Sequence, residues 1–160
     1  KFLSMLKKNK FPTYLQKIKV WKKDKKKIVV TNGCFDLLHP GHKYLFRKSK
    51  KKNHKLVVLI NSDLSVKRLK GKNRPIQNEK IRKKKVDLNK FVNLSIIFRE
   101  KTPLKLIKKI KPDYIVKGAD YKNKKISGSG YIKNYGGKIK IIELYKKYST
   151  TNIIKNKLWK

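Results

Sequence analysis

Two histidines three residues apart have the side-chain type and spacing that suit phosphate chemistry. His39 and His42 flank Pro40 and Gly41 in the segment HPGH, ahead of a segment with helical character. Imidazoles so placed at a helix N-terminus can face one anion together, aided by backbone N–H groups and the helix dipole. A neutral imidazole can donate to phosphate oxygens, and a protonated one does so more strongly. Gly41 lets a phosphate approach the backbone closely.

By itself, the HPGH segment is equally compatible with two surface histidines in a turn. A zinc site is less well supported, because a third ligand of the right type is missing nearby. The remaining histidine, His54, stands in a lysine-rich turn. The pair therefore needs support from other parts of the sequence.

Polar and glycine residues follow several of the predicted strands. They occupy residues 31–36 (TNGCFD), 61–63 (NSD) and 117–120 (KGAD), and residues 149–151 (STT) precede the last predicted helix. In open parallel sheets, ligands bind beyond the carboxyl ends of the strands, near the point where the strand order reverses. These segments, together with HPGH, predict one shared binding site at that edge.

The elements that would position these residues alternate along the chain. Runs rich in Ile and Val predict strands at residues 28–33, 55–61, 94–98, 113–117 and 138–143. The sequence between them predicts helices at residues 41–52, 79–90 and 103–110 and from residue 150, with a loop and a helical turn at 64–74. This alternation predicts an α/β fold, a Rossmann-like three-layer sandwich with a five-stranded parallel sheet and helices on both faces.

Residues 1–27 are predicted to form a basic helical N-terminal extension. Leu15, Ile18 and Trp21 recur there at helical spacing. Residues 28–160 are then predicted to form one domain, which is long enough to bury a sizeable core.

The net charge of +38 arises from 47 basic and 9 acidic residues. Such a field attracts nucleic acids, nucleotides and anionic membranes without sequence preference. However, the excess is spread along the whole chain and is almost entirely lysine, whereas base readout relies on arginine. We interpret the charge as compositional drift and expect no specific nucleic-acid complex.

Cys34 is the only cysteine, which excludes an internal disulfide and fits a reducing compartment. No apolar run approaches the ~18 residues that a membrane span requires. The lysine-rich N-terminus lacks the apolar core of a signal peptide. The sequence therefore predicts a cytoplasmic protein without membrane association.

The segment GCFDLLHPGH resembles the signature of the cytidylyltransferase-like nucleotidyltransferase superfamily. More narrowly, the chain is similar to the adenylyltransferase domains of bacterial ADP-heptose synthesis. The shared segments are TNGCFDLLHPGH, NSDLSVKRLKGKNRP, KPDYIVKGADY and YSTTNII. They follow the family's order and span about residues 26–158.

The resemblance implies transfer of AMP from ATP to D-glycero-β-D-manno-heptose 1-phosphate. The products would be pyrophosphate and ADP-heptose for the lipopolysaccharide core. It implies Mg²⁺ that bridges the triphosphate with few direct protein ligands, a separate heptose kinase, and a homo-oligomer. Two alternatives remain open: a cytidylyltransferase acting on glycerol 3-phosphate or a related small phosphate, and, in another class, a basic nucleic-acid-binding protein.

The resemblance also implies roles for individual residues. The expected catalytic residues, which stabilise charge on the phosphates, are His39, His42 and Lys70. The expected nucleotide-binding residues are Thr31, Asn32, Gly33, Cys34, Phe35, Asp36, Gly41, Lys67, Arg74, Lys117, Gly118, Asp120, Ser149, Thr150 and Thr151.

Several of these residues have structural interpretations as well. Asp36 could orient its loop, meet a ribose or merely cap a turn, and Cys34 fits a small packed residue better than a nucleophile. Residues 149–151 also form an ordinary helix N-cap. Arg82 matches the family's pattern but equally suits a structural ion pair.

Overall fold

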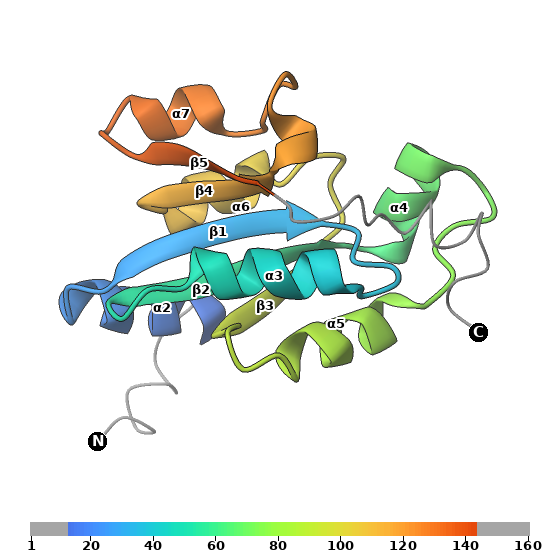
Figure 1. Cartoon of the computed structure of the whole chain (residues 1–160), viewed down its shortest axis with the longest axis horizontal. Helices are drawn as coiled ribbons and strands as arrows, with labels where there is room; N and C mark the ends of the chain where they lie inside the picture. Colours follow the sequence, from blue (N-terminus) through green and yellow to red (C-terminus); the bar gives the residue numbers. More distant parts are fainter. Residues whose placement is uncertain (1–12, 144–160) are drawn as a thin grey trace.

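A five-stranded parallel sheet forms the centre of the computed structural model, which describes residues 13–143. Its strands are β1 (Lys27–Gly33), β2 (His54–Asn61), β3 (Leu94–Phe98), β4 (Tyr114–Gly118) and β5 (Lys138–Ile142). Their order across the sheet is β3-β2-β1-β4-β5 (Figure 1), and every pairing is parallel. The chain therefore starts at the central strand β1, adds β2 and β3 on one side of it, and then adds β4 and β5 on the other side. The carboxyl ends of β1 and β4 flank this switch point, where folds of this kind bind ligands.

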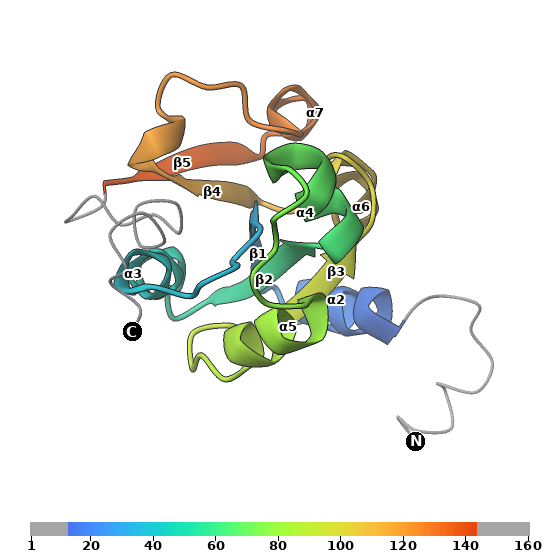
Figure 2. The same ribbon diagram turned by 90° about the vertical axis from the view of Figure 1, so that its right-hand side faces the viewer.

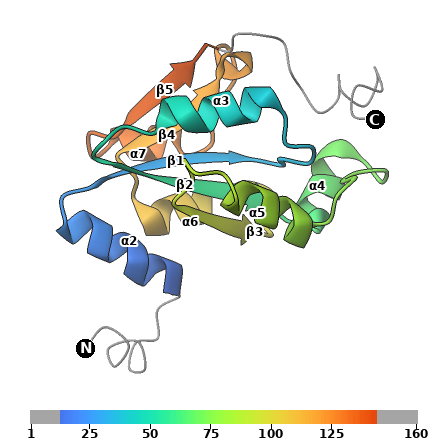
Figure 3. The ribbon, with the colours of Figure 1, turned by 60° about the horizontal axis from the view of Figure 1, so that its bottom comes forward.

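Helices connect the strands, because two parallel strands can be joined only by a crossover connection. They are α2 (Thr13–Lys23), α3 (Pro40–Ser49), α4 (Asp63–Lys70), α5 (Glu79–Asp87), α6 (Leu104–Ile110), α7 (Ser129–Lys133) and the 3-10 helix η1 (Ala119–Tyr121). α3 and α5 cover one face of the sheet, and α2, α6 and α7 cover the other (Figure 2). Figure 3 shows α2 and α3 on opposite sides of the strands. The predicted three-layer Rossmann-like sandwich is confirmed.

Side chains of the central strands alternate between two apolar layers, as the pleat requires. Val29 and Leu56 pack with Phe46 of α3 on one face. Ile28 and Ile107 belong to the layer on the other face. Because both faces of β1 and β2 are buried, their sequences read as continuous apolar runs.

α2 forms part of the second layer. Ile18 is 2% exposed and lies in the same core cluster as Ile28. Lys22 Nζ donates to the backbone oxygens of Ile110 and Lys111, both at 2.7 Å. These bonds satisfy carbonyls at the end of α6, so the predicted basic extension supplies a helix to the sandwich through its residues 13–23.

Two helices differ from the predictions. The sequence predicts a loop with a helical turn at residues 64–74, whereas α4 is a regular helix that is capped by Ser62 and ends at Gly71 (φ 96°). α7 lies between the predicted strands 113–117 and 138–143, where the sequence predicts no helix; it follows Gly128 (φ 84°) and buries Ile132. Both helices are short and bury few side chains, so their apolar periodicity is too weak to identify them.

The helix predicted from residue 150 lies outside the described residues, as do Ser149, Thr150 and Thr151. Within residues 13–143, no helix is long and apolar enough to cross a membrane.

Candidate active site

His39 and His42 stand at the start of α3, at the carboxyl edge of the sheet. Each ring caps the other's backbone: Nδ1 of His39 accepts from the His42 N–H at 3.4 Å, and Nδ1 of His42 accepts from the His39 N–H at 3.5 Å. The rings stack with their centroids 3.7 Å apart. Pro40 occupies the first helical position, where a missing N–H costs nothing. Because each Nδ1 accepts, the proton of each neutral ring belongs on Nε2, which makes Nε2–H the ring donor.

Both imidazoles are neutral near pH 7. Burial lowers the pKa of His39 to about 4. Burial, together with the charges of His39 and Lys70, lowers the pKa of His42 to about 3, although a hydrogen bond with the Leu37 backbone opposes the shift. The protonated form, which would donate more strongly, is therefore absent at neutral pH, and positive charge for an anion must come from lysine and arginine.

Lys70 is the cation that the fold brings to the histidine pair. It ends α4, and its charge lowers the pKa of both His42 and Cys34. Lys67 lies one turn earlier on the same helix, and both lysine side chains are exposed. Of the two predicted lysines, Lys70 is the one whose charge acts on His42.

Asp36 holds the loop that follows α4. Its carboxylate is fully buried and accepts from the backbone N–H groups of Ile76 and Gln77 and from Arg74 Nε at 2.8 Å. Among the interpretations of Asp36, this geometry corresponds to orienting the loop. Arg74, predicted to contact phosphate, is anchored here by its ion pair, and its Nη2 is buried without a partner in the described residues.

Arg82 connects several backbone segments of the site. The sequence allowed two interpretations of this residue, a match to the family's pattern and a structural ion pair. Its side chain is fully buried and donates to three backbone oxygens, those of Cys34, Asn61 and Gln77. It also forms an ion pair with Asp63 at 2.8 Å. Arg82 therefore joins the ends of β1 and β2 to the start of α4 and to the loop before α5. This geometry agrees with the interpretation of Arg82 as a structural ion-pair partner, and it adds hydrogen bonds to the backbone of the site.

Cys34 contributes its backbone oxygen, which accepts from Arg82, whereas Phe35 contributes its ring. Burial raises the pKa of the Cys34 thiol, so the thiol is neutral, as expected for a packed residue. Phe35 is 5% exposed, and its ring packs edge-on against His42 and next to Phe46. A Cβ at Gly33 would meet this ring at 3.2 Å, so glycine there permits the close approach.

Lys117 joins β4 to β1 at the switch point. Its Nζ donates to the backbone oxygen of Asn32 at 2.7 Å and lies 4.3 Å from the centre of the Tyr121 ring. The residue is 4% exposed, and burial lowers its pKa to about 8, so the amine is mostly protonated at neutral pH. Gly118 leads directly into η1, on which Asp120 is exposed.

Within the described residues, four buried side-chain atoms lack a hydrogen-bond partner. They are Thr31 Oγ1, Asn32 Oδ1, Arg74 Nη2 and Gln77 Oε1. Thr31 and Asn32 stand at the end of β1, while Arg74 and Gln77 belong to the loop held by Asp36. Unsatisfied buried polar atoms are costly and rare in folded proteins, so their concentration here fits a site that a ligand completes.

The predicted site residues within 13–143 thus come from the ends of β1 and β4, the start of α3, the end of α4 and the loop after α4. Gly41 is buried in the first turn of α3. Tyr121 was missed by sequence reasoning, because its contact with Lys117 depends on how η1 turns back towards the strand.

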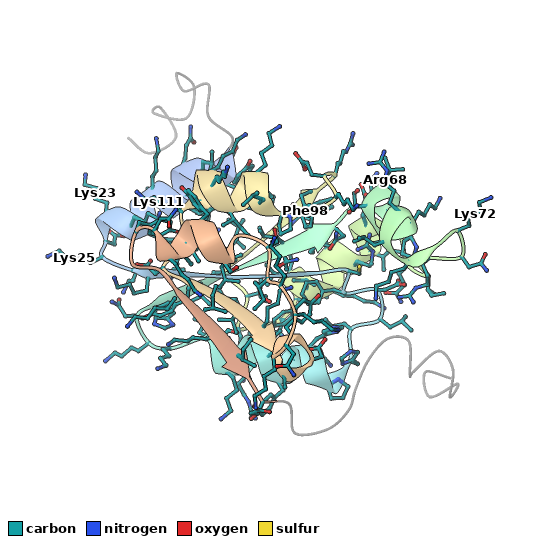
Figure 4. All side chains as sticks on the ribbon, turned by 90° about the horizontal axis from the view of Figure 1, so that it is seen from above. Lys23, Lys25, Arg68, Lys72, Phe98 and Lys111 are labelled. Carbon is teal, nitrogen blue, oxygen red and sulfur yellow. The ribbon has the colours of Figure 1, made fainter. Side chains whose placement is uncertain are left out.

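Basic side chains lie at opposite ends of the described part of the molecule. Figure 4 shows side chains extending from both ends of the molecule, with Lys23, Lys25 and Lys111 at one end and Arg68 and Lys72 at the other. Among the described residues, the basic side chains are therefore not confined to one end of the molecule.

Residues 30–156 match the model of a family described as cytidylyltransferase-like. Among similar proteins, "Bifunctional protein HldE" of Gluconobacter oxydans (strain 621H) is 42% identical over 138 residues, which cover 86% of this chain and 29% of that protein. The protein of the same name from Campylobacter concisus (strain 13826) is 49% identical over 133 residues, which cover 83% of this chain and 27% of that protein. The chain therefore spans less than a third of the length of these relatives.

A solved structure has the same fold. The lipopolysaccharide core biosynthesis protein from Thermoplasma volcanium GSS1 superposes with a TM-score of 0.59 at 33% sequence identity. The match covers 77% of this chain and 98% of that one.

Proposed function

Because this nucleotidyltransferase belongs to the cytidylyltransferase-like family, we propose that it transfers AMP from ATP to D-glycero-β-D-manno-heptose 1-phosphate and releases pyrophosphate. The observation that carries the proposal is the neutral pair of His39, which is buried, and His42, which is half-buried, together with the charge of Lys70 on His42. The heptose acceptor is supported by the similarity to the HldE proteins and to a lipopolysaccharide core biosynthesis protein.

The residues of the site suit a direct displacement. A phosphate oxygen of the sugar 1-phosphate attacks the α-phosphorus of ATP, and the bond from that phosphorus to the bridging oxygen breaks. The electron pair leaves with pyrophosphate. Nε2–H of His39 and His42 donates to the phosphate oxygens, while Lys70 offsets their growing charge. Positioning by the fold, rather than a covalent intermediate, supplies the rest of the acceleration.

Mg²⁺ is expected to arrive with the triphosphate. The carboxylates of Asp36 and Asp63 are engaged by Arg74 and Arg82, and residues 13–143 contain no group of three metal-ligating side chains. This donor set fits a cation that is held mainly by phosphate oxygens. When bound, Mg²⁺ would neutralise charge on the nucleotide.

The test is to incubate the purified protein with ATP, Mg²⁺ and heptose 1-phosphate and to measure pyrophosphate release. A parallel reaction contains CTP and glycerol 3-phosphate, since the matching family is named for cytidylyl transfer. We expect release in the first reaction. Release only in the second would replace the proposed substrates, and release in neither would overturn the proposal.

A further inference from the structure

A second cavity, of about 280 Å³, lies away from the candidate active site, on the face of the sheet that carries α3. Its floor is apolar and consists of Val29, Val116 and Ile142, which belong to the core layer under α3 or pack against it. β4 and β5 extend beyond α3 at this point (Figure 1). Ser49, at the end of α3, lines the cavity, whereas His42 stands in the first turn, so about 10 Å of helix axis separates the two residues.

Three lysines surround this cavity. Lys48 and Lys51 come from the end of α3 and the turn after it, and Lys140 comes from β5. Within residues 13–143, none of the three forms an ion pair. Lys140 Nζ lies 4.1 Å from the centre of the ring of Tyr114, which also lines the cavity. The cavity therefore combines an apolar floor with a cationic rim that has no counter-charge among the described residues.

His54 lines the same cavity, and its pKa reflects the positive field there. Burial is the largest cause that lowers this pKa, and the charges of Lys140 and Lys51 lower it further, although the backbone of Ser49 and the charge of Asp113 raise it. The Asp113 carboxylate is itself engaged, because it accepts from a backbone N–H and from a lysine of β1. Positive charge therefore dominates around the cavity, and the histidine is neutral near pH 7.

The lining selects a ligand with one apolar part and one anionic part. Pockets that bind small molecules are mostly apolar, with a few charged groups that orient the ligand. A phosphate monoester carries a charge of about −1.5 to −2 at pH 7, which suits three lysines better than the single charge of a carboxylate. Residues 144–160, which follow β5 in the sequence, contain five lysines and no carboxylate. They therefore offer no counter-charge to this rim.

We propose that this cavity is a second ligand site, which binds a small phosphate monoester with an aromatic or aliphatic group at its other end. The phosphate contacts Lys48, Lys51 and Lys140, and the apolar group lies on the floor of the cavity. The ammonium groups need only small movements to reach the phosphate, because lysine side chains are long and flexible. This site does not depend on the proposed function, since its ligand is additional to the substrates.

The probe that tests the site is phenyl phosphate, titrated into the whole protein while backbone amide shifts are followed by NMR. We expect saturable shifts at Ser49, His54 and Lys140, and smaller ones at residues 39–42. Two further titrations divide the probe into its parts: inorganic phosphate keeps the charge without the ring, and benzyl alcohol keeps the ring without the charge. Phenyl phosphate should bind at least about 10-fold more tightly than either. Equal affinity for inorganic phosphate would overturn the proposal, because the apolar floor would then contribute nothing.

Two variants test the cationic rim. Lys51→Met and Lys140→Met should each weaken the binding of phenyl phosphate by about 3- to 10-fold, because each removes one charged donor at similar side-chain volume. The matched control is Lys133→Met, which removes the same charge from an exposed lysine of α7, on the opposite face of the sheet. It should change the affinity by less than about twofold.

Three results would overturn the site. An equal loss of affinity in the control would show that the general positive field binds the probe. Shifts confined to residues 39–42 would place the probe at the candidate active site. The absence of saturable shifts at Ser49, His54 and Lys140 would show that the cavity does not accept the ligand, as when another part of the chain fills it. If Lys140→Met fails to fold, Lys51→Met decides, because Lys51 is exposed.

Discussion

At the scale of single residues, burial decides what the histidines can do. An exposed histidine near pH 7 is a mixture of charged and neutral forms, whereas His39 and His42 have pKa values of about 4 and 3. Their capping bonds also direct the proton to Nε2. The pair therefore presents two neutral rings whose protonation does not change between pH 6 and 8.

Replacing one ring should remove much of the catalysis. We expect His42→Ala to lower kcat by about 10²- to 10³-fold, because a preorganised donor to the phosphates is lost. The measurement is the rate of pyrophosphate release at saturating substrates. His54→Ala, at a histidine remote from the site on β2, is the control and should retain activity. An unchanged kcat for His42→Ala, with folding verified by circular dichroism, would remove this ring from the mechanism.

The same burial makes stability depend on pH. Unfolded histidines titrate near a pKa of about 6.5, above the folded values for His39 and His42, so the unfolded state binds more protons between these values. The stabilising contribution is complete above about pH 6.5, diminishes as the pH falls below that value, and is lost once the pH has fallen through about 4 and 3. Thermal unfolding at pH 7.5, 6 and 5 should show a decreasing midpoint.

The double variant His39→Asn/His42→Asn should show a smaller decrease over this range. His54 is present in both proteins, so its titration cancels from the comparison. Equal slopes in the two proteins would show that other groups cause the acid sensitivity.

At the scale of elements, two ion pairs, each with one fully buried partner, hold the loops of the site. Asp36 with Arg74 fixes the loop after α4 against the loop before α3. Arg82 with Asp63 joins the ends of β1 and β2 to α4 and α5. Site geometry therefore depends on contacts that join segments distant in the sequence.

Removing Arg82 should destabilise the whole fold. Arg82→Met leaves three backbone oxygens and the half-exposed Asp63 carboxylate without their donor, and each unsatisfied buried acceptor costs about 1–3 kcal/mol. Urea denaturation measures the loss in free energy of unfolding. Arg68→Met, at an exposed arginine on α4, should change that free energy by less than about 0.5 kcal/mol. A similar small change for Arg82→Met would show that the network contributes little.

At the scale of the molecule, the charge of +38 is distributed over the surface rather than concentrated at the site. Such a field raises the local concentration of anionic ligands, and salt screens it. Six ion pairs within residues 13–143 compensate few of the lysines. The field is therefore a property of the whole surface.

Binding to duplex DNA should accordingly be weak and indifferent to sequence. We expect its affinity to fall by at least about 10³-fold between 50 and 200 mM salt, as counterion release predicts when six or more phosphates are contacted. Fluorescence anisotropy with two unrelated duplexes measures both properties. A tight complex with one duplex that survives 200 mM salt would instead support the nucleic-acid-binding alternative.

Much of the architecture could be predicted from local pattern. Apolar runs located the five strands, and their alternation with helices determined a parallel sheet whose carboxyl edge gathers HPGH and KGAD. The helices α4 and α7 were not predicted, because they bury few side chains. When a helix exposes most of its surface in a lysine-rich chain, its sequence contains too few apolar residues to show a helical periodicity.

By itself, the sequence determined which residue types stand at the candidate site: two histidines at a helix start, lysines in the segment 64–74 and a lysine at the end of the fourth strand. Only the tertiary structure decided their chemical state. Burial makes the histidines neutral, Asp36 is engaged by Arg74, and Lys117 meets Asn32 across two strands. Hydrogen-bond partners and desolvation depend on segments distant in the chain, which local spacing does not encode.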